Sequence, residues 1–257
     1  MRPRRTLRAV LLAALATVAT GALLTSGLTV ANAAGTGPVT LQQRDSSVVT
    51  ADPLATVQID NGYVWAQTMI GNTVFAGGGF ANARAPLAAP GTSLTPRSNI
   101  LSYDIRTGNL LSFAPQVNGP IRAVAASPDG TRLYIGGSFT SVNGQARANF
   151  AALNPVTGAL LPGFTASIGG AGVFAIATLR DSVYVTGRFT QANGVARQNL
   201  AAFAAANGAL RSWAPTLDRQ GDAMVIDPDG SHVIVGGRFY LTNGVVQRGL
   251  APLDPVT

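Results

Sequence analysis

The sequence contains no cysteine, no lysine and no glutamate, and its only histidine is His232. Without cysteine the chain has no disulfide scaffold, no zinc–cysteine site and no thiol nucleophile. Charged residues make up only 11% of the 257 residues and hydrophobic residues 47%, which excludes a disordered tail and indicates a folded domain. Because all acids are aspartates and nearly all bases are arginines, acid–base catalysis has few candidate residues.

The first 33 residues have the pattern of a secretory signal peptide. Residues 1–8 contain four arginines, residues 9–30 are mostly Ala, Leu, Val and Thr, and Ala31-Asn32-Ala33 ends the segment. A basic start, an apolar middle and a small-x-small end predict cleavage after Ala33. The alternative is a retained membrane anchor, since the apolar run approaches the ~20 residues that span a bilayer. The run is interrupted by glycine and serine, which favours removal.

The charge balance also depends on this leader. Arg4-Arg5 fits either an ordinary basic leader or a twin-arginine export signal. Loss of residues 1–33 removes four arginines and no acid, so the net charge falls from +7 to +3. The remaining arginines are scattered singly, without the basic cluster and interleaved aromatics of a nucleic-acid site. We therefore expect a secreted, extracellular or cell-surface protein with no nucleic-acid partner and no stable membrane insertion after cleavage.

The rest of the chain repeats a segment of about 50 residues. The segment Leu133–Thr140 (LYIGGSFT) recurs as Val183–Thr190 (VYVTGRFT) and Val233–Tyr240 (VIVGGRFY), at intervals of 50 residues. An earlier copy, Val74–Phe80 (VFAGGGF), precedes the first of these by 59 residues. The first repeat therefore carries an insertion of about nine residues, which falls within Ala81–Ser98.

Each repeat predicts four short β-strands. In the third repeat the apolar stretches are residues 173–178, 183–189, 200–204 and 210–215, bounded by Gly, Asn, Asp or Pro. The second strand is apolar on both faces, so its sheet must be covered on both sides. Stacked four-stranded antiparallel sheets describe an all-β fold, a β-propeller with about four blades in this chain. The glycine pairs at 136–137 and 236–237 would let backbones approach closely.

The predicted organisation is a signal peptide (1–33), an N-terminal segment (34–62) and propeller repeats over 63–257, divided into 63–119, 120–170, 171–220 and an incomplete 221–257.

These repeats resemble the delta-sixty type of secreted bacterial β-propeller, a family of unknown function. The resemblance rests on Gly-Gly-x-Phe followed by Asn-Gly, then Arg-x-Asn, then Asn-Pro-x-Thr-Gly, as in Asn143-Gly144, Arg147-Ala148-Asn149 and Asn154–Gly158. The diglycine also resembles kelch repeats, and Ser127–Thr131 resembles surface-layer propellers. The fourth copy departs from the pattern, with Gln247 and Gly249 in place of Arg and Asn. The likeness implies the fold and no particular activity.

The fourth repeat stops at Asp254-Pro255-Val256-Thr257, before its outer strand. One explanation is that residues 53–59 supply the missing strand and close a four-bladed ring. The other is that the chain is a fragment of a protein with more blades, which we favour because an incomplete ring exposes apolar end faces.

Catalytic and metal-binding chemistry finds little support in the sequence. Asp227-Pro228-Asp229-Gly230 resembles the start of a calcium loop, but no glutamate exists to complete it, and a turn is the expected structure. His232 has no recognisable nucleophile partner. Asp104, Asp218, Asp222 and Asp254 could pair as in a glycosidase, but nothing places two of them in one cleft. We expect no catalytic residue, cofactor or metal.

Recurring arginines precede the third strand in the first three repeats. Arg97, Arg147 and Arg197 are expected to tie adjacent blades together by donating to backbone carbonyls, or else to bind a ligand. In an antiparallel blade the second-to-third and fourth-to-first connections emerge on one face, which would carry the insertion, the Asn-Gly loops and residues 218–222. The candidate ligand-face residues are Arg84, Arg97, Arg147, Arg197, Asp218, Arg219 and Asp222.

The two tryptophans, Trp65 and Trp213, could be assigned to sugar stacking. Trp213 occupies the same repeat position as Phe113, and a repeated aromatic at that position predicts core packing. Taken together, the sequence predicts a propeller that binds an extracellular protein or glycan without catalytic residues of its own. The alternative is a piece of an extracellular enzyme, polysaccharide-degrading or quinoprotein-like, whose catalytic residues lie outside this chain.

Overall fold

The computed structural model describes residues 55–257, together with the backbone of two short strands, β1 (Thr29–Ala31) and β2 (Pro38–Thr40). β1 and β2 pair antiparallel and belong to a unit, residues 1–53, that is separate from the unit 54–257. The rest of the predicted signal peptide lies outside the described residues. In the described part of the chain every regular element is a strand, and no helix has the length and apolarity needed to span a bilayer.

The repeats form four antiparallel sheets, which confirms the all-β propeller prediction. Each sheet has its middle strand bonded to the first and third strands of the repeat. The sheets are β4 (Tyr63–Ile70), β5 (Thr73–Gly79), β8 (Ile100–Asp104); β9 (Ile121–Ala126), β10 (Leu133–Gly137), β13 (Phe150–Leu153); β14 (Ile168–Leu179), β15 (Ser182–Ala192), β17 (Leu200–Ala204); and β18 (Gly221–Ile226), β19 (Val233–Gly237), β22 (Leu250–Leu253).

Short hairpins connect the second and third strands of each sheet. They are β6 (Asn82–Arg84) with β7 (Leu94–Pro96), β11 (Ser141–Val142) with β12 (Gln145–Ala146), β16 (Val195–Ala196) against the end of β15, and β20 (Leu241–Thr242) with β21 (Val245–Val246). In three of them Asn and Gly, both at positive φ, form the two-residue turn. The insertion of the first repeat lengthens this same hairpin between β6 and β7.

The predicted fourth strand is reduced to a single bridge. Leu210 bridges Phe203, and corresponding bridges form in the first and second repeats. After the bridge the chain turns inward, so that Trp213 is buried against the next repeat and Pro215 offers no N–H to a ladder. The blades are therefore three-stranded, with a bridging segment in place of the fourth strand, because burying the aromatic side chain competes with strand pairing.

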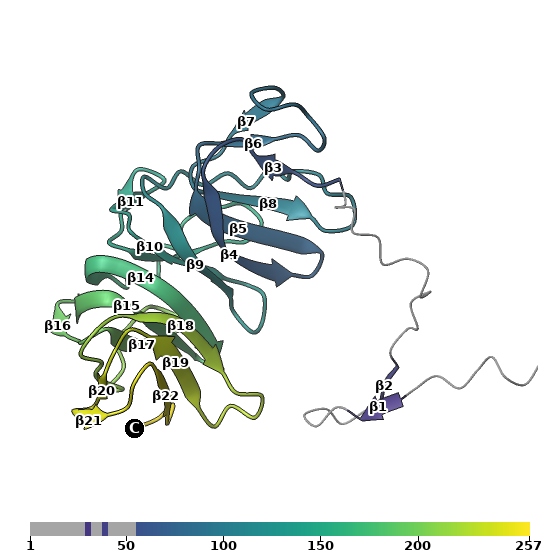
Figure 1. Cartoon of the computed structure of the whole chain (residues 1–257). Coiled ribbons are helices and arrows are strands. Elements are labelled where there is room, and N and C mark those ends of the chain that lie inside the picture. The colour runs from purple at the N-terminus through teal and green to yellow at the C-terminus, as the bar shows by residue number, and fades with distance from the viewer. Residues whose placement is uncertain (1–28, 32–37, 41–54) are drawn as a thin grey trace, which may run out of the picture. The chain divides into compact units, whose positions relative to one another are not determined.

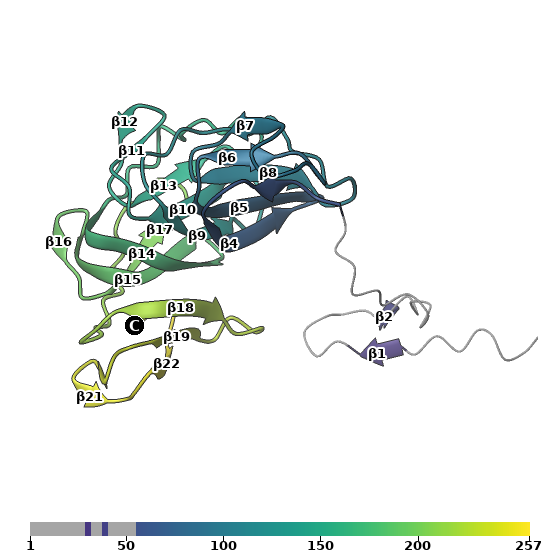
Figure 2. The ribbon, with the colours of Figure 1, turned by 45° about the horizontal axis from the view of Figure 1, so that its top comes forward.

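The sheets stack face to face, as Figures 1 and 2 show for β14–β15 against β18–β19. The prediction that the middle strand is buried on both sides is confirmed in β10. Leu133 and Ile135 face the first sheet in one cluster with Phe75, whereas Tyr134 faces the third sheet in another cluster with Phe203. The core therefore consists of apolar layers between consecutive sheets.

Glycine allows this close stacking at Gly136. A Cβ built there would lie 2.5 Å from Cγ1 of Val173 in the next sheet. The same prediction is wrong for Gly236, whose built Cβ would meet nothing nearer than 3.9 Å, because among residues 55–257 no sheet covers that face of β19. Gly137 and Gly237 instead approach the backbone of their own first strand.

The segments between repeats are shared between neighbouring sheets. Val117, at the end of the first repeat, bridges Val142 in the hairpin of the second repeat, and Leu217 likewise bridges Thr242. β3 (Gln58–Ile59) occupies the corresponding place in the first repeat, where Ile59 pairs with Ala83. Within the proposed closing strand at residues 53–59, residues 58–59 pair with β6 of the first repeat. The four sheets form an open arc (Figure 1).

Candidate functional site

The asparagines of the Asn-Gly turns hold the hairpins in place. Asn143 Oδ1 accepts the N–H of Gln116 at 2.8 Å, and its Nδ2 donates to Gly158 O at 3.0 Å. Asn193 makes the equivalent pair of bonds, to Ser167 N and Gly208 O. These side chains are engaged with the backbone on both sides, which accounts for their recurrence without a ligand.

The recurring arginines also bond to the backbone. Nη2 of Arg97 donates to Leu111 O at 2.8 Å, and Nη2 of Arg197 donates to Arg211 O at 3.1 Å. Arg147 donates through Nη1 to Ala146 O at 2.7 Å. The carbonyls belong to the same repeat, so the expectation of a tie between adjacent blades is wrong, because the bridging segment lies nearer than the next sheet. Burial lowers the pKa of Arg97.

The asparagine of Arg-x-Asn joins the second strand of its sheet to the segment that leads into the next repeat. Asn199 adopts φ 65°, accepts the N–H of Phe189 and donates from Nδ2 to Leu217 O at 2.9 Å. In the fourth repeat Gly249 keeps the positive φ, 75°, but has no side chain to make these bonds. Glycine in place of asparagine in the fourth repeat therefore preserves the backbone conformation but loses the two side-chain hydrogen bonds.

Two further candidates are held by local contacts. Arg84, in the insertion hairpin of the first repeat, pairs with Asp60 at 3.5 Å and also bonds to Gln58 of β3. Asp218 Oδ1 accepts the N–H groups of Tyr240 and Leu241 at 2.8 and 2.9 Å, and these bonds keep the pKa of Asp218 below its usual value. In the second repeat Asn118 Oδ1 accepts Thr140 N and Ser141 N in the same way, so this role needs no charge.

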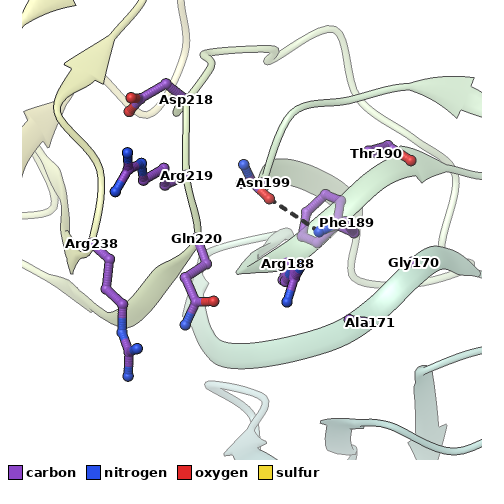
Figure 3. A pocket seen from close by; sticks show the side chains of 10 residues that line it. All are labelled: Gly170, Ala171, Arg188, Phe189, Thr190, Asn199, Asp218, Arg219, Gln220 and Arg238. Atoms are coloured by element: carbon purple, nitrogen blue, oxygen red, sulfur yellow. Dashed lines mark hydrogen bonds between the residues drawn. The ribbon is translucent and has the colours of Figure 1, made fainter.

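Two candidates meet in a pocket beside the loops of the third and fourth repeats (Figure 3). Its volume is about 770 Å³, and Asp218 and Arg219 line it together with Arg188 of β15, Arg238 after β19, and Gln220. Asp222 borders it through Arg238, whose Nε lies 3.2 Å from Asp222 Oδ2. The other predicted site residues, Arg84, Arg97, Arg147 and Arg197, do not line this pocket.

The pocket carries more positive than negative charge. Arg219 lies over the ring of Tyr240, 4.5 Å from its centroid, and Arg248 lies over the same ring at 4.7 Å. Within residues 55–257 no carboxylate pairs with Arg188 or Arg219. An arginine pocket with two unpaired guanidinium groups is suited to an anionic group, which guanidinium can bind through two parallel hydrogen bonds.

Arg188 and Arg238 were missed in the sequence analysis. Both stand in the Gly-Arg-Phe of the third and fourth repeats, where the second repeat has Gly-Ser-Phe with Ser138. The first repeat has Gly79 there. Because two repeats fold with a small residue at this position, the blade does not require the arginines. This difference between the repeats is the sequence feature that could have identified them as candidate binding residues.

A serine, a histidine and an aspartate come together in the turn after β18. His232 Nδ1 lies 2.8 Å from Asp227 Oδ2 and 2.7 Å from Ser231 Oγ, and Ser231 also donates to Asp227 at 2.7 Å. In a catalytic triad the serine and the aspartate contact opposite ring nitrogens, whereas here both contact Nδ1. Several hydrogen bonds lower the pKa of Asp227, and the bond donated by the backbone N–H of His232 contributes most. This arrangement stabilises a turn, as the sequence predicted for residues 227–230.

The two tryptophans differ in their surroundings. Trp213 is 3% exposed, and its Nε1 donates to Asp254 O at 2.7 Å, which confirms the predicted core packing. Trp65, on β4, is 42% exposed and lies beside Arg122 of β9, the first strand of the next sheet. Among the residues that the structure describes, no three His or Asp side chains gather as metal ligands.

Comparison with known proteins supports the repeat fold. A family model described as "Domain of unknown function (DUF5122) beta-propeller" matches residues 128–164, a part of the second repeat. No curated protein matches the sequence.

Solved structures with similar arrangements have low sequence identity. The computationally designed Ika4 protein is 13% identical, with a TM-score of 0.49 over 80% of this chain and 99% of its own. Hydrazine synthase of Kuenenia stuttgartiensis is 14% identical, with a TM-score of 0.43 over 80% of this chain. U3-55K is 11% identical, with a TM-score of 0.44 over 71% of this chain. The match spans 49% of each of the last two chains. By the family model, the chain carries a β-propeller domain whose second repeat is similar to a β-propeller family of unknown function.

Proposed function

We propose that this protein is an exported binding module that takes an anionic ligand at the arginine pocket between its third and fourth repeats. The observation that carries the proposal is the presence of Arg188, Arg219 and Arg238 around one cavity (Figure 3). The second repeat folds with Gly119 and Ser138 at the positions of Arg219 and Arg238. Side chains that the fold does not need, gathered at one cavity, favour a role in recognition.

The charges of the pocket favour a carboxylate or phosphate group. Asp222 pairs with Arg238, and Asp218 accepts two backbone N–H groups, so neither forms an ion pair with Arg188 or Arg219 among residues 55–257. A ligand anion would therefore meet donors that need no rearrangement of an existing ion pair. At an exposed site one such contact is weak, on the order of 1 kcal/mol, so two or three of them should give a small anion a dissociation constant on the order of 10 mM.

Export rests on the N-terminal pattern of residues 1–33. It is tested by producing the full chain in a bacterial host and sequencing the N-terminus of the protein recovered outside the cells. A mature chain that begins at Ala34 is expected. Retention of Met1 in a membrane-bound product would contradict export as a cleaved protein.

Anion binding is tested by titrating the chain with citrate and with inorganic phosphate while recording arginine side-chain NMR signals. We expect saturable shifts for Arg188 and Arg219, and loss of binding in the Arg188→Gln/Arg219→Gln double variant. Arg106→Gln is the matched control, since Arg106 is an exposed arginine in the turn after β8 and does not line the pocket. Absence of saturable shifts, or equal loss in the control, would refute the assignment.

A further inference from the structure

The first strand of every sheet contains a β-bulge at the same repeat position. The register shifts between Val64 and Ala66 in β4, between Gly136 and Gly137 of β10 opposite β9, between Val173 and Ala175 in β14, and between Gly221 and Ala223 in β18. The extra residues are Trp65, Arg122, Phe174 and Asp222. A bulge leaves its extra residue unpaired and re-aims the side chain.

These bulge residues form a continuous row across three sheets. The guanidinium of Arg122 lies 4.2 Å from the ring centroid of Trp65 and 4.8 Å from that of Phe174. The ring of Tyr63 extends the row, with its centroid 4.1 Å from that of Trp65. The first strands β4, β9, β14 and β18 contact one another in sequence, so the row follows the inner edge of the arc.

The row leads to the arginine pocket. Phe174 stands on β14, the strand that also contributes Gly170 and Ala171 to the pocket lining. Asp222, the bulge residue of β18, bonds to Arg238 and Gln220, which line the pocket as well. Aromatic rings, an arginine, a carboxylate and the pocket therefore share one path.

The row is not required for packing. Tyr63 and Trp65 are 47% and 42% exposed, and neither belongs to an apolar core cluster. The four repeats place a tryptophan, an arginine, a phenylalanine and an aspartate at one equivalent position, so the fold accepts any of these side chains there. Two neighbouring exposed aromatic rings on an exported domain are an unusual surface and favour a binding role.

We propose that the ligand is an acidic oligosaccharide that lies along this inner edge. One sugar ring packs against the exposed part of Trp65, and a uronate carboxylate binds Arg188 and Arg219 in the pocket. The proposal rests on the proposed function and extends it, since the pocket alone would hold only one acidic sugar.

The carboxylate in the row distinguishes this ligand from a single-stranded nucleic acid. Nucleic-acid strands also bind to stacked aromatic and basic side chains, but their phosphates need a positively charged track. Here Asp222 and Asp218 lie on the path, and they would repel a phosphodiester backbone while accepting hydrogen bonds from sugar hydroxyls. The chemistry of the path is therefore that of a hydroxyl-rich ligand with widely spaced acid groups.

The test compares glucuronic acid with a hexasaccharide in which glucuronate alternates with neutral N-acetylglucosamine, by isothermal titration calorimetry. For the unmodified chain we expect the hexamer to bind more tightly than the monomer, and neutral maltohexaose not to bind. Trp65→Ala should weaken hexamer binding by about tenfold, the scale of a central aromatic contact, and leave glucuronic acid binding unchanged. Trp65→Phe should retain most of the hexamer affinity.

Leu87→Ala is the matched control, because Leu87 is an exposed apolar side chain in the insertion, away from the row. Unchanged unfolding temperatures would show that both variants fold. If glucuronic acid binds but Trp65→Ala leaves the hexamer affinity intact, the extended site is refuted and the pocket stands. If neither sugar acid, citrate nor phosphate binds, the proposed function itself fails. Equal or tighter binding of oligothymidylate would overturn the choice of a glycan.

Discussion

Substitution of one repeated glycine tests whether neighbouring sheets are held at the distance that the structure shows. Gly136 and Gly236 occupy the same position in the second and fourth repeats, and both have negative φ, so alanine is compatible with either backbone. A Cβ at residue 136 would lie 2.5 Å from Val173 Cγ1 and 2.8 Å from Val173 Cβ. A Cβ at residue 236 would meet its nearest neighbour at 3.9 Å.

The expected effects therefore have opposite signs. Val173 is branched at Cβ and fully buried, so it cannot rotate away, and the sheets must separate. Such overpacking costs about 1–3 kcal/mol, less the roughly 0.5–1 kcal/mol that alanine contributes over glycine in a strand. Gly136→Ala should destabilise the chain by about 1–2 kcal/mol, whereas Gly236→Ala should be neutral or stabilise it by up to about 1 kcal/mol.

Urea unfolding of the chain, with each variant analysed by linear extrapolation, measures both effects. In thermal unfolding the Gly136→Ala difference corresponds to a decrease of about 2–8 °C in Tm. Equal stability changes in the two variants would refute the reasoning, since they would show that the contact with Val173 does not limit the distance between the second and third sheets.

Substitutions at three other residues address individual contacts, each measured against the unmodified chain. Asp218→Asn should leave Tm unchanged, because Asn118 makes the same bonds, whereas Asp218→Ala should lower it; equal effects would contradict the role of the side-chain oxygen. Tyr134→Phe should cost about 1–2 kcal/mol in urea unfolding, because it leaves Ala205 O without the hydroxyl that donates to it at 2.9 Å. The hydrogen bond from the Ser127 hydroxyl, followed by bonds from Thr131, lowers the pKa of Asp129 from 3.8 to about 2. The Asp129 carboxylate therefore stabilises the fold above pH 4 and loses this effect as the pH falls towards 2. Asp129→Asn should therefore flatten the dependence of Tm on pH in that range, and an unchanged profile would contradict it.

The sequence predicted the sheet fold because its physical cause is local. The middle strand is apolar at every position from Leu133 to Ile135, and such a strand must be buried on both faces. The Asn-Gly turns were also readable, since their positive φ values require those residue types. These features depend on residues close together in the chain.

The parts of the site that were missed depend on contacts between repeats. The bulges that re-aim Trp65 and Arg122 insert one residue into an otherwise regular alternation, and this leaves no mark in a short apolar strand. The pocket arginines, Arg188 and Arg238, are 50 residues apart, and only the stacking of two sheets brings them together. Likewise, the bridging segments bury their aromatic rings and do not pair as full fourth strands. Strand propensity alone does not predict which of these two arrangements a segment adopts.

The bridges between repeats bear on how the domain folds. Because Val117 and Leu217 complete the hairpin of the repeat that follows their own, the second and fourth repeats depend on the preceding repeat for part of their backbone hydrogen bonding. The smallest cooperative unit is therefore a pair of neighbouring repeats, and stability should spread along the chain by nearest-neighbour coupling. Native-state hydrogen exchange should then show amides of two adjacent sheets opening together, with the outermost pair opening first.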